Sequence, residues 1–252
     1  MITDDLQNPT KKTCIKCGNL IAVSSKFCNG CGVIQTNEIS TESKWSLIKQ
    51  AGFFYAVTIL LCVLVNFVDA FQTFGWYIFF VGALAIVTVS FFVFNWAENK
   101  SVLTWHSFSL QKLCAYCGLA IIASVLVHFS VGWLNVTIYA KQEEYYTALR
   151  GNLFGEFILI FFTAVMPALF EELGFRGYLL QTLLKVADVQ QAVYISSFLF
   201  AIIHMSFISL FWLIPFALFV GFVRTKEGTL WYGVFIHFCF NLTACMFLLS
   251  GG

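Results

Sequence analysis

Five long apolar runs and two shorter ones alternate with polar connections along the 252-residue chain. A helix needs about 20 apolar residues to cross the roughly 30 Å of hydrocarbon in a bilayer. The long runs are Ala51–Val68, Phe74–Phe94, Leu113–Val136, Leu153–Phe170 and Leu230–Leu249. The shorter runs, Ala192–His204 and Phe207–Val223, are nearly continuous and predict two helices joined by a tight turn. The pattern therefore predicts an all-α polytopic membrane bundle of about seven transmembrane helices, preceded by a small polar module. A further half-buried helix over Gly177–Val186 leaves six to eight spans open.

Composition supports a membrane protein over a large soluble one. The chain is 60% hydrophobic and 11% charged, with 30 phenylalanines, whereas soluble domains average about 25% charged residues. The net charge of +1 gives no indication of nucleic-acid binding. The first residues are polar and of mixed charge, so we expect no cleavable signal peptide.

The distribution of lysine and arginine predicts the orientation of a multi-pass protein of the cell membrane. With the N-terminus in the cytosol, the inside segments hold Lys11, Lys12, Lys16, Lys26, Lys44, Lys49, Lys100, Lys112, Lys185, Arg224 and Lys226. The outside loops hold only Lys141 and Arg150, with Arg176 counted as intramembrane. This asymmetry fits the positive-inside rule and an odd number of spans.

The N-terminal module carries two CxxC pairs, whose cysteines are the candidate metal ligands Cys14, Cys17, Cys28 and Cys31. Glycine follows each pair and permits the turn that directs two thiolates to one ion. Four thiolates suit tetrahedral zinc and leave no open position for catalysis, so a structural zinc ribbon is predicted. Two disulfides are the alternative, and a reducing cytosol opposes them.

The predicted domain boundaries follow from these patterns. The zinc ribbon covers residues 1–34, a polar linker covers residues 35–48, and the membrane domain covers residues 49–252. A tethered ribbon of this kind suits docking of a protein partner. The other partners expected are membrane lipids and a peptide or membrane-protein substrate.

Ionisable and strongly polar residues recur within the apolar runs. The set comprises Glu171, Glu172, Arg176, His204, His237 and Asn241. Residues four apart share a helix face, so Glu172 can pair with Arg176, and His237 can act with Asn241. Glu171 is rotated by roughly 100° from its neighbour, so one carboxylate can be paired while the other faces a cavity. Pro167, which removes a backbone donor, is expected to kink the helix just before them.

Packing alone does not account for this set. A hydrogen bond between membrane helices contributes about 0.6 kcal/mol on average, whereas a charge in the membrane costs at least about 2.5 kcal/mol. His128 is interpreted as a packing residue and Glu156 as an interfacial one. One difficulty is depth: with the fourth span ending near Phe170, Glu171 lies near the cytosolic edge while the two histidines lie deeper. A tilted or kinked fourth helix would bring them together.

Three motifs resemble those of the CPBP family, which comprises CAAX prenyl endopeptidases and bacteriocin-processing or immunity membrane proteins. "EELGFRG" resembles its EExxxR motif, "FAIIH" its FxxxH motif and "HFCFN" its HxxxN motif. The resemblance covers roughly Gly155 to Leu249 and implies an intramembrane peptidase. In this comparison Glu171 is the general base that activates water, and His204 assists it. His237 and Asn241 stabilise the oxyanion, and the pair of Glu172 and Arg176 holds the site.

Alternative interpretations of both the cofactor and the function stay open. The family is also described as metal-dependent, with glutamate and histidine as ligands, so a catalytic metal stays open beside the metal-free glutamate mechanism. The first hypothesis is an intramembrane endopeptidase that acts on a membrane-associated peptide or protein. The alternatives are a non-proteolytic scaffold or immunity-type protein that binds a partner, and a transporter with a proton relay. The intact polar set favours catalysis, and no internal repeat supports a transporter.

Overall fold

The structure, a computed structural model, describes residues 11–22, 25, 27–33, 41–71, 73–105, 108–134 and 153–250. The predicted positions Lys26, Lys141 and Arg150 lie outside these residues, as do residues 35–40 of the predicted linker. The chain divides into two compact units, Met1–Ser43 and Lys44–Gly252. Each unit is described by itself below.

The small unit is a two-stranded hairpin beside a cluster of cysteines. Strand β1 (Lys11–Thr13) pairs antiparallel with β2 (Leu20–Ala22). Ile21 is buried with Cys14 and Cys28, which form the only apolar core found among the described residues of this unit. Gly18 and Gly32 adopt positive φ angles of 73° and 69° directly after the two CxxC pairs. Only glycine takes this conformation without strain, so both turns depend on these residues.

The large unit is helical in its described residues. Its helices are α1 (Thr41–Phe67), α2 (Phe74–Phe94), α3 (Trp96–Asn99), α4 (Leu110–Leu134), α6 (Leu153–Ile160), α7 (Met166–Glu172), α8 (Leu180–Leu183), α9 (Val189–Ile202), α10 (Leu210–Glu227) and α11 (Trp231–Ser250). Short 3₁₀ turns cover Asp69–Phe71 and Lys100–Leu103. Residues 41–48, expected in the linker, instead form the first turns of α1.

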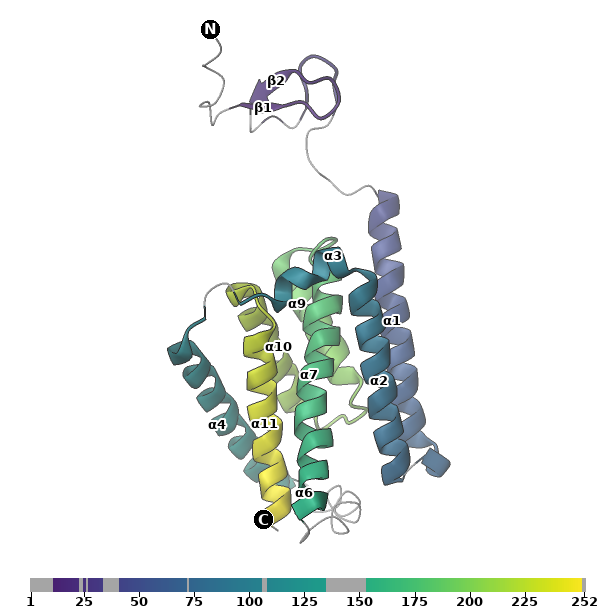
Figure 1. The fold of residues 1–252 in the computed structure, drawn as a ribbon, viewed down its shortest axis with the longest axis vertical. Coiled ribbons are helices and arrows are strands. Elements are labelled where there is room, and N and C mark those ends of the chain that lie inside the picture. Colours follow the sequence, from purple (N-terminus) through teal and green to yellow (C-terminus); the bar gives the residue numbers. More distant parts are fainter. Residues whose placement is uncertain are drawn as a thin grey trace. The chain divides into compact units, whose positions relative to one another are not determined.

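One continuous helical segment runs through the middle of this unit. It consists of α6, a π turn at Phe161–Val165, α7, a second π turn at Leu173–Leu179, and α8. We call this segment the central helix. It lies between α2 and α11, while α4 packs on the far side of α11 (Figure 1). The predicted end of the fourth span at Phe170 is wrong, because the helix continues to Leu183; residues 177–183 therefore belong to it and not to a separate helix.

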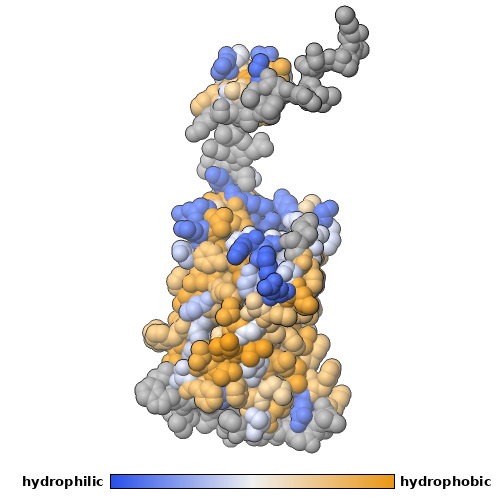
Figure 2. All heavy atoms as spheres, turned by 90° about the vertical axis from the view of Figure 1, so that its left-hand side faces the viewer, coloured by the Kyte–Doolittle hydropathy of each residue, from blue (hydrophilic) through white to orange (hydrophobic). Residues whose placement is uncertain are grey.

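Among the residues that the structure describes, five helical segments are long and apolar enough to cross a membrane, and they correspond to the five long runs of the sequence. They are Glu42–Phe67, Phe74–Phe94, Leu110–Ser130, Phe154–Leu183 and Trp231–Ser250. The shorter apolar helix α9 and the 18-residue α10 pack on each other and complete the predicted bundle. Figure 2 shows apolar side chains over the body of the unit, with hydrophilic ones gathered at one end.

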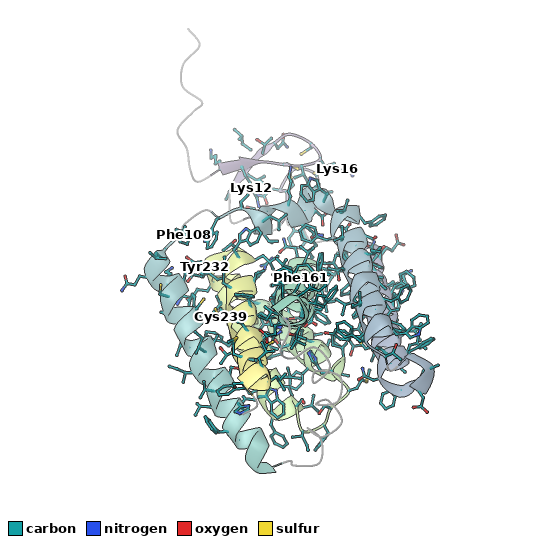
Figure 3. All side chains as sticks on the ribbon, turned by 60° about the horizontal axis from the view of Figure 1, so that its bottom comes forward. Lys12, Lys16, Phe108, Phe161, Tyr232 and Cys239 are labelled. Carbon is teal, nitrogen blue, oxygen red and sulfur yellow. The ribbon has the colours of Figure 1, made fainter. Side chains whose placement is uncertain are left out.

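Local chemistry sets the ends of the two shorter helices. Asp188 caps α9 by accepting a hydrogen bond from the Gln191 backbone N–H at 2.9 Å. Gly228 ends α10 in the left-handed conformation with φ 68°. Helices α9 and α10 approach closely because Gly221 of α10 has no side chain: a Cβ at residue 221 would lie 3.0 Å from the side chain of Val193 in α9. The side chains that fill the unit are shown in Figure 3, with Tyr232 and Cys239 on α11.

Candidate active site

The two adjacent carboxylates of the central helix occupy different environments. Glu172 is completely buried, whereas the side chain of Glu171 is 27% exposed and lines a hollow in the membrane unit. This separation agrees with the rotation of neighbouring helix positions. Of the two, Glu171 is thus the carboxylate that a bound molecule can reach.

Glu172 is held by two partners. Its Oε1 lies 3.2 Å from Nη1 of Arg176, one turn further along the helix, as the spacing predicted. The same oxygen lies 2.9 Å from Nδ1 of His237 on α11. The carboxylate therefore joins the central helix to α11, in addition to pairing with arginine.

Arg176 is enclosed on its other sides as well. Its Nη2 donates to the backbone carbonyl of Ala217 on α10 at 3.2 Å, and its guanidinium carbon lies 4.3 Å from the centre of the Phe200 ring. Burying a charge is costly unless it is paired and hydrogen-bonded. The arginine meets this requirement with one carboxylate, one carbonyl and one aromatic face.

His237 lies between the two carboxylates. Its Nδ1 contacts Glu172, and its Nε2 is 3.9 Å from Oε2 of Glu171. The rings of Phe200 and Phe216 lie edge-on to the imidazole, with centroids 5.9 and 5.3 Å away. The ring is therefore fixed by one buried carboxylate and two aromatic side chains, and its Nε2 is directed to the hollow.

His204 follows the last turn of α9 and does not lie within it, because α9 ends at Ile202. Its Nδ1 lies 2.9 Å from the backbone carbonyl of Phe200. A carbonyl only accepts hydrogen bonds, so Nδ1 carries the proton and Nε2 of the neutral ring is an acceptor. The residue lines the same hollow as Glu171.

Asn241 is anchored to the central helix through a backbone carbonyl. Its Nδ2 donates to the carbonyl oxygen of Thr163 at 3.2 Å. In a regular helix that carbonyl would accept from the N–H of the residue four positions later, which here is Pro167 and has no N–H. The proline therefore leaves the Thr163 carbonyl available to Asn241. The helix continues through this point as a π turn at Phe161–Val165.

The four residues with pocket-facing roles meet in one hollow of about 290 Å³. Glu171, His204, His237 and Asn241 all line it. The expected difficulty of depth disappears because the central helix continues past Glu171, which places this residue within a 30-residue span.

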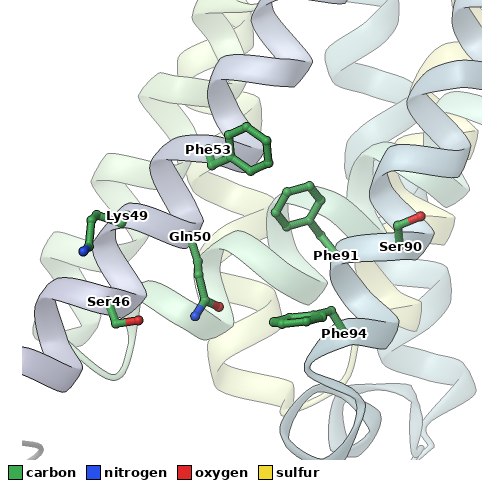
Figure 4. Close-up of a pocket in the computed structure, with 7 residues that line it drawn as sticks. All are labelled: Ser46, Lys49, Gln50, Phe53, Ser90, Phe91 and Phe94. Atoms are coloured by element: carbon green, nitrogen blue, oxygen red, sulfur yellow. The ribbon is translucent and has the colours of Figure 1, made fainter.

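A larger opening of about 480 Å³ between α1 and α2 (Figure 4) contains none of these four residues. Its lining residues are Ser46, Lys49, Gln50, Phe53, Ser90, Phe91 and Phe94.

Three groups that lie outside the sequence motifs also hold residues of the site. The carbonyls of Thr163 and Ala217 and the ring of Phe216 each fix a site residue. A signal existed for Thr163, since it precedes Pro167 by four residues. Nothing in the sequence indicated the other two, because they act across helices. His128, outside the site, stacks on Phe247 with a centroid distance of 3.9 Å.

Metal-binding geometry occurs in the small unit. The sulfur atoms of Cys14, Cys17, Cys28 and Cys31 all lie within 4.8 Å of one another. Two of the pairs are 3.7 and 3.5 Å apart, and four thiolates around zinc at 2.3 Å would be about 3.8 Å apart. The backbone N–H of Cys17 lowers the pKa of Cys14 to about 6, whereas the neighbouring thiols of Cys14 and Cys31 contribute to raising the pKa of Cys17 to about 12. This cluster can bind a metal ion such as zinc.

No second cluster of this kind is found among the described residues. Within the hollow, Nε2 of His237 lies 3.9 Å from Oε2 of Glu171, while Nδ1 of His237 is bound to Glu172.

Residues 153–243 match the family model described as Type II CAAX prenyl endopeptidase Rce1-like. This range includes all of Glu171, Glu172, Arg176, His204, His237 and Asn241. The resemblance indicated by the motifs is confirmed over this segment, which is similar to the Rce1-like endopeptidases. A comparison with curated proteins finds no match, and a comparison with solved structures finds none.

The family match carries a general implication for the chemistry. The Rce1-like family implies a protease of the CAAX type, and the apolar helices make this chain a multi-pass membrane protein.

Proposed function

We propose that this chain is an intramembrane endopeptidase that hydrolyses a peptide bond in a membrane-associated peptide or protein, with Glu171 as the base that activates water. One observation carries the proposal. Glu171 is a reachable carboxylate inside a membrane span, whereas its neighbour Glu172 is neutralised by Arg176. A carboxylate kept available at this depth needs a use, since its burial costs free energy.

Water activation would involve two residues. Glu171 takes a proton from a water molecule in the hollow, and the oxygen of that water attacks the carbonyl carbon of the scissile bond. Nε2 of His204 accepts a hydrogen bond from the same water, because Nδ1 is bound to the Phe200 carbonyl. His204 thus orients the nucleophile and does not need to change its protonation.

The developing oxyanion would be stabilised from α11. Asn241 uses one N–H on the Thr163 carbonyl and retains a second N–H on the same nitrogen for the oxyanion. Nε2 of His237 can donate when the ring is doubly protonated, because Nδ1 already donates to Glu172. Preorganised donors of this kind are usually the largest contribution in acyl transfer. Collapse of the intermediate then breaks the C–N bond, and Glu171 returns its proton to the leaving nitrogen.

We favour a metal-free reaction, because the proposed steps need only side chains of this chain and one nitrogen of His237 is already bound to Glu172. In the small unit we propose zinc as the structural ion of the four cysteines, with the ribbon on the cytosolic side and available to a protein partner. The described lysines and arginines at the α1, α4 and α10 ends support that orientation.

The test compares purified wild type with Glu171→Gln and the matched variant Glu156→Gln, which replaces another carboxylate of the same helix. Each protein is incubated in detergent with a peptide library, and products are read by mass spectrometry. We expect cleavage by wild type and Glu156→Gln, and a loss of at least about a hundredfold in Glu171→Gln. Equal cleavage by both variants would contradict the role of Glu171.

Absence of cleavage by a folded wild type would remove the peptidase proposal. The scaffold alternative would then be supported by retention of a partner by both wild type and Glu171→Gln.

A further inference from the structure

A second hollow opens beside Glu171, and we call it the α1–α2 hollow. It is not the larger opening of Figure 4, which does not include Glu171. The α1–α2 hollow has a volume of about 260 Å³ and shares Pro167, Glu171 and His204 with the hollow of the active site. The two hollows therefore meet at the carboxylate that is proposed to activate water. A peptide with its scissile bond at Glu171 has space on both sides.

The walls of the α1–α2 hollow come mainly from one face of each of two helices. Helix α1 contributes Phe54, Thr58, Cys62, Val65 and Asn66, and α2 contributes Tyr77, Phe80, Val81, Leu84 and Thr88. Spacings of three and four residues place these side chains on a common face of each helix. The central helix adds Met166, Phe170 and Phe175.

Polar side chains in these walls direct their donors to the backbone. Thr58 donates to the carbonyl of Phe54 at 2.9 Å, and Asn66 donates to the carbonyl of Cys62 at 2.8 Å. Tyr77 donates to the carbonyl of Phe162 at 3.1 Å. Apart from Thr88 and the thiol of Cys62, the lining that remains is aliphatic and aromatic, except at Glu171 and His204 where the two hollows meet.

We propose that the α1–α2 hollow is the specificity subsite of the enzyme and takes one large apolar side chain of the substrate, next to the scissile bond. The inference rests on the proposed function. An apolar cavity of roughly 150 Å³ is enough to hold benzene, so the volume here accommodates an aromatic or a large aliphatic side chain. Continuity with Glu171 places the occupant beside the reacting carbonyl.

This subsite assigns substrate selection to a part of the chain outside the Rce1-like segment. Helices α1 and α2 precede residue 153, where the family match begins. The catalytic residues and the specificity wall would then be supplied by different parts of the sequence.

The experiment measures kcat/KM for peptides that differ only in one residue beside the cleaved bond, with alanine, leucine, phenylalanine or tryptophan at that position. Wild type is expected to prefer a large apolar residue over alanine by at least about tenfold on one side of the bond. Val81→Phe fills the hollow and should shift the preference towards alanine. Leu84→Ala enlarges it and should shift the preference towards tryptophan.

Ile86→Phe is the matched control for the filling variant. Ile86 is on the same helix, is 70% exposed and does not line the hollow, so its substitution should leave the preference unchanged. The proposal is overturned if wild type shows no preference, or if Val81→Phe and Leu84→Ala both retain the preference of wild type. A preference that moves equally in Ile86→Phe would also overturn it.

A binding measurement separates this inference from the proposed function. Peptides that carry the photoreactive residue benzoylphenylalanine are irradiated with the Glu171→Gln protein, and adducts are mapped by mass spectrometry. Adducts within residues 54–66 or 77–88 that decrease in a Val81→Phe background support the subsite, even if no peptide is cleaved. Adducts elsewhere only, or none, overturn it.

Discussion

At the scale of single residues, the chemistry of the site depends on how neighbouring groups are held. Glu171 and Glu172 are identical side chains one position apart. Glu172 is buried between Arg176 and His237, whereas Glu171 faces the hollow. Contacts with Arg176 and with His237 on α11, and not residue type, distinguish the two carboxylates.

Glu172→Gln should destabilise the protein by about 3–5 kcal/mol, because it leaves the buried Arg176 without its counterion. It should also lower cleavage, since His237 exchanges a charged acceptor for the weaker neutral oxygen of an amide. Unfolding of the detergent-solubilised protein measures the first effect. Glu98→Gln is the control: Glu98 pairs with Lys185 but is 53% exposed, so its loss should cost less than about 1 kcal/mol. Equal destabilisation by the two substitutions would contradict the buried network.

Pro167→Ala should lower kcat by on the order of tenfold, because misplacement of a catalytic group is costly. The new N–H competes with Asn241 for the Thr163 carbonyl. In an Asn241→Ala background the same substitution should have little further effect, and this non-additivity is measured by a double-mutant cycle. Pro215→Ala in α10 serves as the control and should be additive with Asn241→Ala. Full additivity of Pro167→Ala would exclude the proposed link.

At the scale of helices, close approach of α11 to the central helix brings His237 to the carboxylates. Gly233 permits this approach, since a Cβ there would lie 3.0 Å from the Val220 side chain and 3.1 Å from Oε2 of Glu172. The site therefore depends on a small residue one turn before His237. No motif in the sequence singled out this glycine.

Gly233→Ala should separate α11 from the central helix by a few tenths of an ångström and reduce cleavage, with a destabilisation of about 1–3 kcal/mol. Activity and unfolding are measured on the same preparation. Gly82→Ala in α2 is the control, because no atom lies within 4 Å of the added Cβ and alanine has the higher helix propensity. Equal effects of the two substitutions would show that the close approach has no role.

At the scale of the whole molecule, the ribbon and the membrane unit are separate compact units. Their chemistry is separate as well, since the cysteine cluster and the carboxylate site share no residue. Loss of the ribbon metal should therefore leave the peptidase reaction unchanged on a soluble peptide.

Metal analysis should find about one zinc per chain in the wild type, and loss of that zinc in Cys14→Ser combined with Cys28→Ser. Four-thiolate sites of this kind fold around their metal, so hydrogen exchange should increase in residues 11–33 of the variant. Cleavage should be retained. Two zinc ions per chain, with the second retained in the variant and needed for cleavage, would contradict the metal-free reaction.

The sequence indicated the long apolar spans, the cysteine cluster and the residues proposed for the site. Apolar run lengths are set by bilayer thickness, so all five long runs overlap observed spans, although the first span begins earlier and the fourth ends later than predicted. Pairs within one helix, such as Glu172 with Arg176, followed from helical spacing alone. The cysteine cluster followed from local turns, and the family segment from three local motifs.

Only the tertiary structure decided how distant segments combine. The apolar pattern stopped at Phe170, but the helix continues because Arg176 pairs with Glu172, donates to the Ala217 carbonyl on α10 and is not exposed to hydrocarbon. The binding of His237 to Glu172 and the α1–α2 hollow also arise between helices far apart in the chain. Local spacing fixes which residues share a face, whereas contacts between faces depend on packing of the whole bundle.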